Sequence, residues 1–285
     1  MITPQKIKEI ELRAADLRET VVEMLLAAGS GHTAGPLGLA DIFAAFYFYI
    51  LKHDPKNPAW EDRDRLLLSN GHVTPVRYAA MAHAGYFPVE ECLTLRKFGS
   101  RLQGHPERER LPGVETTSGP LGSGLGQACG YALGARMDSQ KFRVYCVMSD
   151  GEQDAGNTWE AAMFAGANKL SNLTAIIDRN NIQINGMTED VMPLENLREK
   201  YEAFGWHVIE IDGHNISAIV SAVEQAKAIY ERPALILAHT IPGKGIPEIE
   251  RDFRYHGYPV GGKEEAKKFL EELRTMQGKV KSEHQ

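Results

Sequence analysis

Two short polar segments of the sequence hold side chains that suit a hard divalent cation. Asp150 follows the apolar run Phe142–Met148, and Asn180 comes soon after a second apolar run, Leu173–Ile177. Ligands collect at the carboxyl ends of parallel strands, so we expect both side chains at one edge of a sheet. One carboxylate, one amide oxygen and a nearby backbone carbonyl suit Mg²⁺ or Ca²⁺, and the coordination positions left open suit phosphate oxygens.

Gly151 strengthens this prediction, because a glycine permits a tight turn directly after the strand. Its backbone N–H, close to the start of the next helix, can donate to the same phosphates. An Asp-Gly pair or an Asn-Asn pair alone is typical of an ordinary turn. Both pairs, at the ends of successive predicted strands, favour a metal and phosphate site over that alternative.

Alternating helices and strands are predicted along the chain, and they would hold these segments in place. The expected helices are 5–28, which ends at Gly29, 39–51, Thr158–Leu170, Ser217–Tyr230 and a surface helix, Lys263–Met276, followed by a polar tail. The expected strands are Phe142–Met148, Leu173–Ile177, Trp206–Ile211 and Ala234–Ala238. The stretch 98–126 predicts long loops. This alternation predicts an α/β fold with a doubly wound, mainly parallel sheet flanked by helices, in one domain over residues 1–285.

The composition is that of an ordinary soluble globule and excludes several classes of protein. The 285 residues are 43% hydrophobic and 25% charged, with a net charge of −6 and no Lys/Arg cluster. Neither a nucleic acid nor a membrane is expected as a partner. The apolar run Leu39–Leu51 contains Asp41 and is too short to span a bilayer. Three widely spaced cysteines and an N-terminus unlike a signal peptide indicate the cytoplasm.

The stretch SDGEQDAGNTWEAAMFAGANKLSNLTAIIDRNNIQING, from Ser149 to Gly186, resembles the thiamine-diphosphate motif of transketolases. Further segments agree with that family in order and spacing: SGHTAGPLGLAD (30–41), LLLSNGHVTPVRYA (66–79), QGHPE (103–107), TTSGPLGSGLGQACGYALG (116–134) and RYHGYP (254–259). The resemblance covers residues 7–262 and implies the thiamine-diphosphate-binding fold.

The resemblance also implies a role for each matching residue. The metal, Mg²⁺ or else Ca²⁺ or Mn²⁺, would be held by Asp150, Asn180 and the backbone carbonyl of Ile182. Residues expected at thiamine diphosphate are His72, Gly119, Leu121, Gly151, Glu160, Asn180, Ile184 and His256. Residues expected at the sugar are His32, His105 and His256, because imidazoles hold hydroxyl groups and accept protons near neutral pH. The remaining histidines are expected on the surface or in satisfied structural positions: His53, His83, His207, His214, His239 and His284.

Two positions depart from the family pattern. Ser149 replaces the first glycine of the motif, which is a small change. Ala155 stands where the family has a glutamate that belongs to a carboxylate network between paired active sites. Glu160, another member of that network, is retained, and Asp154 is a candidate substitute for the missing carboxylate. Ala155 therefore puts the coupling between sites in question, but not metal or cofactor binding.

Four glycines recur every four residues and would lie on one face of a helix: Gly122, Gly126, Gly130 and Gly134. Glycine in a helix costs up to about 1 kcal/mol relative to alanine, so a helix or the cofactor is expected to approach that face closely.

The apolar helix over 39–51 is expected in the core or under a partner chain. We expect the chain alone to self-associate through the 39–51 and 121–134 faces. Gly243-Lys244-Gly245 is expected as a surface turn.

Thiamine chemistry in this family also needs a pyrimidine-binding domain, which supplies the activating glutamate. That domain follows the present one in full-length transketolases and is absent from this sequence. The chain thus resembles the N-terminal subunit of a split transketolase. It would be inactive without its partner, the C-terminal subunit, with which it would form an α2β2 assembly. The expected reaction transfers a two-carbon ketol unit from a ketose or ketose phosphate to an aldose or aldose phosphate.

Two alternatives to this function stay open. One is half of a related thiamine enzyme with a specialised donor, such as a sulfonated or non-phosphorylated sugar. The other is a non-catalytic, cofactor-binding scaffold module. The four retained histidines argue against the scaffold, whereas Ala155 gives it some weight.

Overall fold

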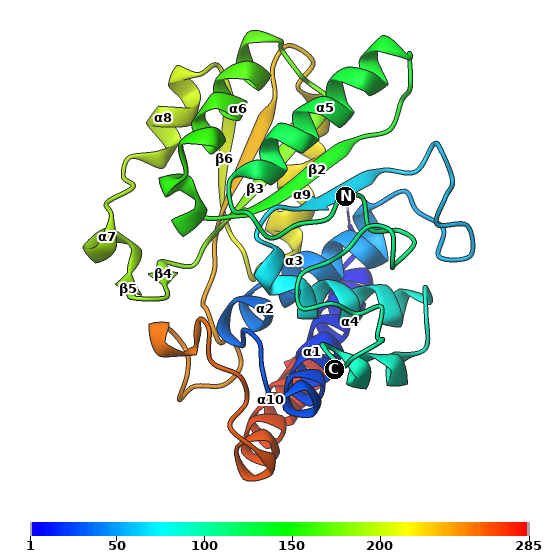
Figure 1. Cartoon of the computed structure of the whole chain (residues 1–285), viewed down its shortest axis with the longest axis vertical. Helices are drawn as coiled ribbons and strands as arrows, with labels where there is room; N and C mark the ends of the chain where they lie inside the picture. The colour runs from blue at the N-terminus through cyan, green and yellow to red at the C-terminus, as the bar shows by residue number, and fades with distance from the viewer. Residues whose placement is uncertain (1, 284–285) are drawn as a thin grey trace.

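A five-stranded parallel sheet forms the centre of the computed structural model, which describes residues 2–283 (Figure 1). The strands are β1 (Arg65–Leu68), β2 (Val144–Ser149), β3 (Leu173–Arg179), β6 (His207–Asp212) and β7 (Ala234–His239), in the spatial order β1-β2-β3-β7-β6. Every neighbouring pair is parallel. Parallel strands need crossover connections, which the alternating helices supply. The predicted α/β fold is confirmed.

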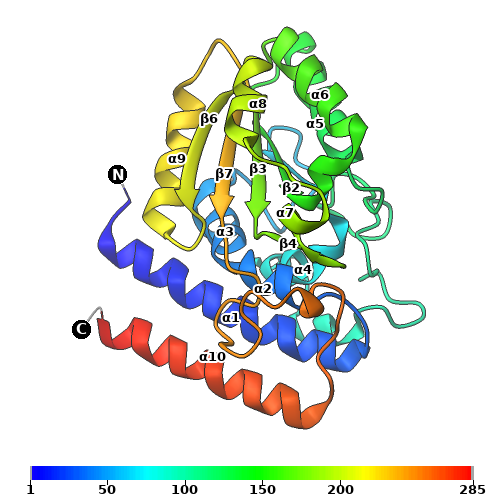
Figure 2. The ribbon, with the colours of Figure 1, turned by 90° about the vertical axis from the view of Figure 1, so that its left-hand side faces the viewer.

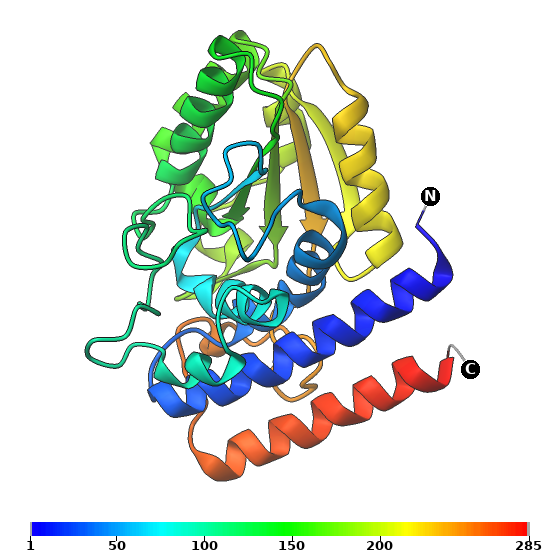
Figure 3. The ribbon, with the colours of Figure 1, turned by 90° about the vertical axis from the view of Figure 1, so that its right-hand side faces the viewer.

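Helices cover both faces of this sheet (Figures 2 and 3). One face carries α5 (Ser123–Met137), α6 (Gly156–Ala167) and α8 (Leu197–Ala203). The other carries α3 (Ala40–Ala45) and α9 (Ile216–Ala228), with α1 (Pro4–Ala28), α4 (Thr74–Ala84) and α10 (Lys263–Glu283) beyond them. Cys146 belongs to the first core and its neighbours Tyr145 and Val147 to the second. Successive side chains of this apolar strand thus pack into two different cores, one on each face of the sheet.

The shorter elements connect these layers. They are α2 (Ala34–Gly38), α7 (Thr188–Val191), the hairpin of β4 (Ile182–Gln183) and β5 (Gly186–Met187), the π-helical segment η1 (Phe46–Ile50), and the 3₁₀ turns η2 (Gly71–Val73), η3 (Val89–Thr94), η4 (Gly151–Asp154) and η5 (Phe253–Tyr255). No helix within residues 2–283 combines the length and apolar content needed to cross a membrane.

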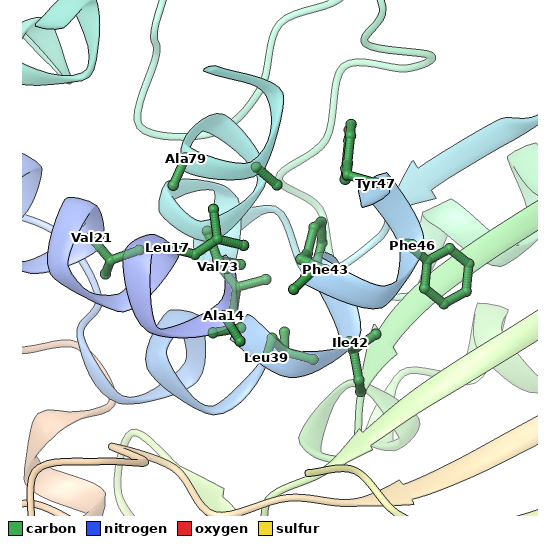
Figure 4. Close-up of a cluster of buried hydrophobic side chains, with 14 of the residues drawn as sticks. Ala14, Leu17, Val21, Leu39, Ile42, Phe43, Phe46, Tyr47, Val73 and Ala79 are labelled. Atoms are coloured by element: carbon green, nitrogen blue, oxygen red, sulfur yellow. The ribbon is translucent and has the colours of Figure 1, made fainter. Parts of the chain in front are cut away.

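The apolar run 39–51 lies inside the core of this chain (Figure 4). It folds as α3 and η1, and Phe43 and Phe46 are each 1% exposed. Leu39 and Phe43 lie with Leu17 of α1 and Val73 in one apolar cluster. The prediction of a buried helix is confirmed, and the chain itself buries it. The predicted self-association through this face is therefore wrong, because the face is already covered.

The other helices and strands lie within a few residues of their predicted bounds, with three differences. β1 and α4, within the segment 65–84, and α8 (Leu197–Ala203) are not among the predicted elements. The last helix continues to Glu283, so the predicted polar tail is helical that far, and His284 lies outside the described residues. Gly243-Lys244-Gly245 forms the predicted turn, but Gly243 is buried in it, and its N–H donates to the carbonyl of Ala34 at 2.8 Å.

Candidate cofactor and substrate site

The two predicted metal-binding segments meet at the carboxyl edge of the sheet. Asp150 directly follows β2 and Asn180 directly follows β3, and Ser149 pairs with Asp178 in the parallel register. The Asp150 N–H donates to the Asp178 carbonyl at 3.2 Å, and the Asn181 N–H donates to Asp150 Oδ2 at 2.7 Å. The structure thus brings the carboxylate and the asparagine segment together, as predicted.

Asp150 is buried and has a polar environment on both carboxylate oxygens. Oδ1 accepts the Gly151 N–H at 2.7 Å, and Oδ2 accepts Arg179 Nη1 at 3.1 Å as well as the Asn181 N–H. Burial raises the pKa of Asp150, while the N–H groups and the guanidinium counteract that effect. Arg179 is itself shared with Glu189 and Glu195. Oδ1 accepts one described donor, so a lone pair remains for a cation.

Asp178, which we did not predict as a site residue, orients the Asn180 amide. Asn180 Nδ2 donates to Asp178 Oδ2 at 2.7 Å, and the Thr240 hydroxyl donates to Asp178 Oδ1 at 2.5 Å. The amide nitrogen therefore faces Asp178, and the amide oxygen points along the chain, where it accepts the Ile182 N–H at 3.0 Å. Complete burial, with the charge of Asp150 nearby, raises the pKa of Asp178 to about 7.

This donor set fits a hard divalent cation. Asp150 offers a carboxylate oxygen, Asn180 an amide oxygen and Ile182 a backbone carbonyl two residues further on. All three are oxygen ligands, which Mg²⁺ and Ca²⁺ prefer. A Cβ at Gly151 would lie only 2.9 Å from Gln183 Cγ, so any larger residue in the turn beside these ligands would have to displace the Gln183 side chain.

The four histidines that match the family converge on one cavity of about 380 Å³ beside this edge. The ring centroids of His32 and His72 are 4.9 Å apart, those of His72 and His256 are 5.1 Å apart, and those of His32 and His256 are 5.7 Å apart. The remaining wall is formed by His105, Gly119, Leu121, Ser149, Gly151, Glu152, Ile182, Gln183, Ile184 and Asn185. Asp150 and Asn180 are buried and do not line the cavity, but Ser149 and Gly151 on either side of Asp150, and Ile182 two residues after Asn180, do.

Burial keeps these imidazoles neutral. It lowers the pKa of His32 to about 4, with further contributions from His256, Arg96 and His105. Burial likewise lowers the pKa of His72, His105 and His256. His32 Nδ1 is buried and has no hydrogen-bond partner among the described residues. A neutral ring keeps one nitrogen as donor and one as acceptor, which suits the hydroxyl groups of a sugar.

Glu152, another residue that we did not predict, joins three elements at the cavity wall. Its carboxylate accepts three hydrogen bonds. The donors are the hydroxyl of Ser69, directly after β1, the N–H of Gly122 before α5 at 2.6 Å, and the N–H of Ser149 at the end of β2 at 3.1 Å. Burial raises the pKa of Glu152. The carboxylate thereby fixes the Gly119–Gly122 loop against the sheet.

Glu160 lies elsewhere, exposed on α6, and does not line the cavity. Asp154, the candidate substitute for the missing carboxylate, accepts the Gln183 amide at 3.0 Å, so it points toward the β4 segment. Ala155 lies against Gly122, as shown by the 2.8 Å that would separate a Cβ at Gly122 from the Cβ of Ala155. The prediction that Glu160 contacts the cofactor has no support in this geometry.

The glycine face of α5 is covered at its N-terminal end and open at Gly130 and Gly134. Gly122 precedes the helix with φ 84°, and a Cβ at Gly130 or Gly134 would meet no atom of this chain within 4 Å. A hollow of about 940 Å³ lies along it, between α5 and the 107–117 loop. The predicted close approach of another helix is thus made by α6 at the Gly122 and Gly126 end of the row, where a Cβ at Gly122 would collide with Asn157 and one at Gly126 would lie 4.0 Å from Ala161 Cβ, and it is not made at Gly130 and Gly134 by the residues that the structure describes.

Most of the other histidines have hydrogen-bond partners away from the cavity, as expected for structural positions. Such partners exist for His53 (Tyr86 and Tyr47), His83 (Thr20), His214 (Asp41 and Ile241) and His239 (Glu210). His207 lies on β6.

The family model described as "Transketolase, thiamine diphosphate binding domain" matches residues 11–277. This chain belongs to the transketolase family. It is 46% identical over 248 residues to the 6-deoxy-6-sulfo-D-fructose transketolase subunit SqwG of Clostridium sp. (strain MSTE9), with 87% of this chain and 90% of that protein covered. It is 38% identical to one of the subunits of the apulose-4-phosphate transketolase of Phocaeicola vulgatus, with 90% and 91% covered.

Full-length transketolases are similar over this chain and continue beyond it. Rat transketolase is 39% identical over 277 residues, and the match covers 94% of this chain but 42% of the rat protein. The crystal structure of Campylobacter jejuni transketolase superimposes with a TM-score of 0.83 at 34% identity, covering 96% of this chain and 48% of that one. The chain thus spans less than half the length of these transketolases and nearly all of the two relatives named as subunits.

Proposed function

We propose that this chain is the diphosphate-binding subunit of a two-chain, thiamine-diphosphate-dependent transketolase that moves a two-carbon ketol unit from a ketose to an aldose. One observation carries the proposal. Asp150 and Asn180, from successive strands, come together at the sheet edge, and their sequence neighbours Ser149, Gly151 and Ile182 line the same cavity as His32, His72, His105 and His256. A cation-binding edge, which can hold a diphosphate through the cation, beside neutral imidazoles combines the two functions that the reaction needs.

Asp150, Asn180 and the Ile182 carbonyl would hold a divalent cation, for which Mg²⁺, Ca²⁺ and Mn²⁺ are candidates, and the cation would bind the diphosphate. Groups that line the cavity beside it would contact the cofactor: His72, Gly119, Leu121, Gly151, Ile184 and His256. Thiamine diphosphate, when bound, supplies the carbanion chemistry that cleaves and forms the C–C bond of the sugar.

His32, His105 and His256 would hold the sugar in this scheme. As neutral rings, they can donate an N–H to one hydroxyl and accept a hydrogen bond from another. The same rings can take the proton that leaves a hydroxyl while the C–C bond breaks, and return it when the acceptor aldose is joined. The position of these three rings in the lining of one cavity supports this role.

A partner chain would complete the site. Two relatives that this chain matches over 90% and 91% of their length are named as subunits, and full-length transketolases have more than twice the matched length. The partner would carry the pyrimidine-binding domain and its activating glutamate, in an α2β2 assembly. We expect this chain alone to be inactive.

The names of two relatives favour a specialised anionic donor. One belongs to a 6-deoxy-6-sulfo-D-fructose transketolase, and the other belongs to an apulose-4-phosphate transketolase. We therefore include a sulfonated ketose and sugar phosphates among the candidate donors, and aldose phosphates among the acceptors.

Reconstitution with the partner tests the proposal. This chain and the product of the adjacent reading frame would be purified separately and mixed with thiamine diphosphate and Mg²⁺. Ketol transfer would then be measured with several donors. Transfer by the mixture and by neither chain alone is expected. Full turnover by this chain unaided would refute the two-chain scheme, and cofactor binding without any transfer would favour a scaffold.

A further inference from the structure

Thr33 joins the segments that carry two of the cavity histidines. Its hydroxyl donates to the Tyr258 carbonyl at 2.6 Å, across 225 positions of the sequence. Thr33 directly follows His32, and Tyr258 comes two residues after His256. The two imidazole rings lie edge to face with their centroids 5.7 Å apart, and a Cβ at Gly257 would lie 3.9 Å from His32 Nε2. The hydrogen bond therefore connects the two segments at the place where their histidines meet.

The fold holds the donor end of this bond firmly. Thr33 is fully buried and directly precedes α2, all of whose residues are buried. Threonine is a preferred N-cap residue, but the Thr33 side chain makes no capping bond to α2. The next residue, Ala34, accepts the Gly243 N–H at 2.8 Å. Thr33 is thus fixed by its surroundings, and its hydroxyl serves a distant acceptor instead of its own helix.

The acceptor end lies in residues 256–260, which form no helix or strand. Within the described range 2–283, the bond from Thr33 is the only hydrogen bond that ties these residues to a segment before Phe253. The His256 N–H donates to the Phe253 carbonyl at 2.9 Å, which is a bond inside the same turn, and Val260 is the one buried residue of the five. The hydrogen bonding that holds His256 at the cavity thus comes from one hydroxyl.

We propose that Thr33 is a positioning residue, which holds His256 at the cavity so that its ring and the ring of His32 face the same sugar. This inference rests on the proposed function and adds to it the group that sets the geometry of the histidine pair. Without the hydroxyl, the Tyr258 carbonyl would lose its donor, and the segment around His256 could move away from His32. A misplacement of about 1 Å at a catalytic group can lower the rate about a hundredfold.

Turnover by the reconstituted complex tests the inference. Thr33→Val and Thr33→Ser would be compared with the wild type, using D-fructose 6-phosphate and 6-deoxy-6-sulfo-D-fructose as donors. We expect kcat for the donor that the enzyme uses to fall about tenfold to a hundredfold in Thr33→Val and to be restored in Thr33→Ser, which keeps the hydroxyl. Thr20→Val is the matched control, because Thr20 is also buried and its hydroxyl also donates to a carbonyl, that of Asp16 at 3.0 Å, outside the cavity.

Trypsin cleavage of the full chain after Arg254 examines the segment without turnover. Arg254 is exposed and lies two positions before His256, so local opening of the segment exposes this peptide bond to the protease. We expect cleavage to be about threefold to tenfold faster in Thr33→Val, the factor that corresponds to one lost hydrogen bond, and unchanged in Thr33→Ser. Thermal unfolding verifies that Thr33→Val folds, and Thr33→Ala, which removes the same hydroxyl without adding a methyl group, is the second variant.

The outcomes separate this inference from the proposed function. Faster cleavage in Thr33→Val with no turnover by any complex, the wild type included, would mean that the proposed function fails while Thr33 still holds the segment. Equal cleavage rates in the wild type, Thr33→Val and Thr33→Ala would overturn the inference. Full turnover by Thr33→Val, or an equal loss of turnover in Thr33→Val and Thr33→Ser, would also overturn it.

Discussion

At the scale of single residues, the site depends on buried carboxylates that are held by N–H donors. Asp150→Asn keeps the shape of the side chain but removes the charge that would attract a cation and leaves Arg179 without one of its partners. We expect the metal-dependent affinity of the reconstituted complex for thiamine diphosphate to fall more than about a hundredfold. Calorimetry with and without Mg²⁺ measures it. Asp154→Asn, which changes a carboxylate bonded to Gln183, is the control. An unchanged affinity for Asp150→Asn would remove Asp150 from the metal site.

The histidine cluster makes the fold sensitive to acid. The pKa of His32 is 6.5 in the unfolded chain and about 4 in the folded one. Between these values the unfolded state binds a proton that the folded state does not, so the free energy of unfolding decreases as pH falls below 6.5, and the loss from this group is complete below pH 4. The wild-type free energy of unfolding should fall between pH 7 and pH 5, and we expect this fall to be about 2 kcal/mol smaller in His32→Gln, as measured by urea unfolding at both pH values. His239→Gln, an exposed change, is the control. Identical pH dependence in His32→Gln and the wild type would contradict this assignment.

At the scale of elements, Glu152 holds together the ends of β1 and β2 and the start of α5. Removing its carboxylate leaves buried N–H donors without an acceptor, so we expect Glu152→Ala to lower the free energy of unfolding by roughly 2–4 kcal/mol. Urea denaturation measures the change. Glu160→Ala, an exposed glutamate on α6, should change it by less than about 0.5 kcal/mol. Comparable effects of the two substitutions would show that Glu152 is not a structural link.

The sequence predicts the elements that have a clear pattern and not the bonds between distant segments. β2 and β3 are apolar runs that end in polar residues, so the strands and the positions of Asp150 and Asn180 could be predicted together. β1 has four residues and is too short for a periodic signal. The partners of Glu152 are distant along the chain, and only the folded sheet brings them together.

At the scale of the whole molecule, the part of the α5 glycine face around Gly130 and Gly134 is a surface that this chain leaves open. A Cβ at Gly130 would meet no atom of this chain within 4 Å, and the residue lines an open hollow, so Gly130→Leu should preserve the fold and can stabilise the helix by up to about 1 kcal/mol. We expect the wild-type chain to self-associate through this face, or to bind its partner there, and Gly130→Leu to disrupt that association, as measured by light scattering. Ser221→Leu, on α9 at the opposite side of the sheet, is the control. A wild-type chain that stays monomeric alone and a Gly130→Leu variant that assembles normally with the partner would contradict the prediction.

The cavity is flanked by two side chains that this chain leaves largely uncovered, Ile184 at 69% exposed and Leu121 at 42%. A cofactor seated between them would be held from one side, so we expect it to exchange with the medium quickly on the isolated chain. The partner chain would then slow the dissociation of the cofactor. Assembly would follow an order, in which thiamine diphosphate binds this chain first and the partner chain binds second. Dilution of the complex would release cofactor and activity at the same rate.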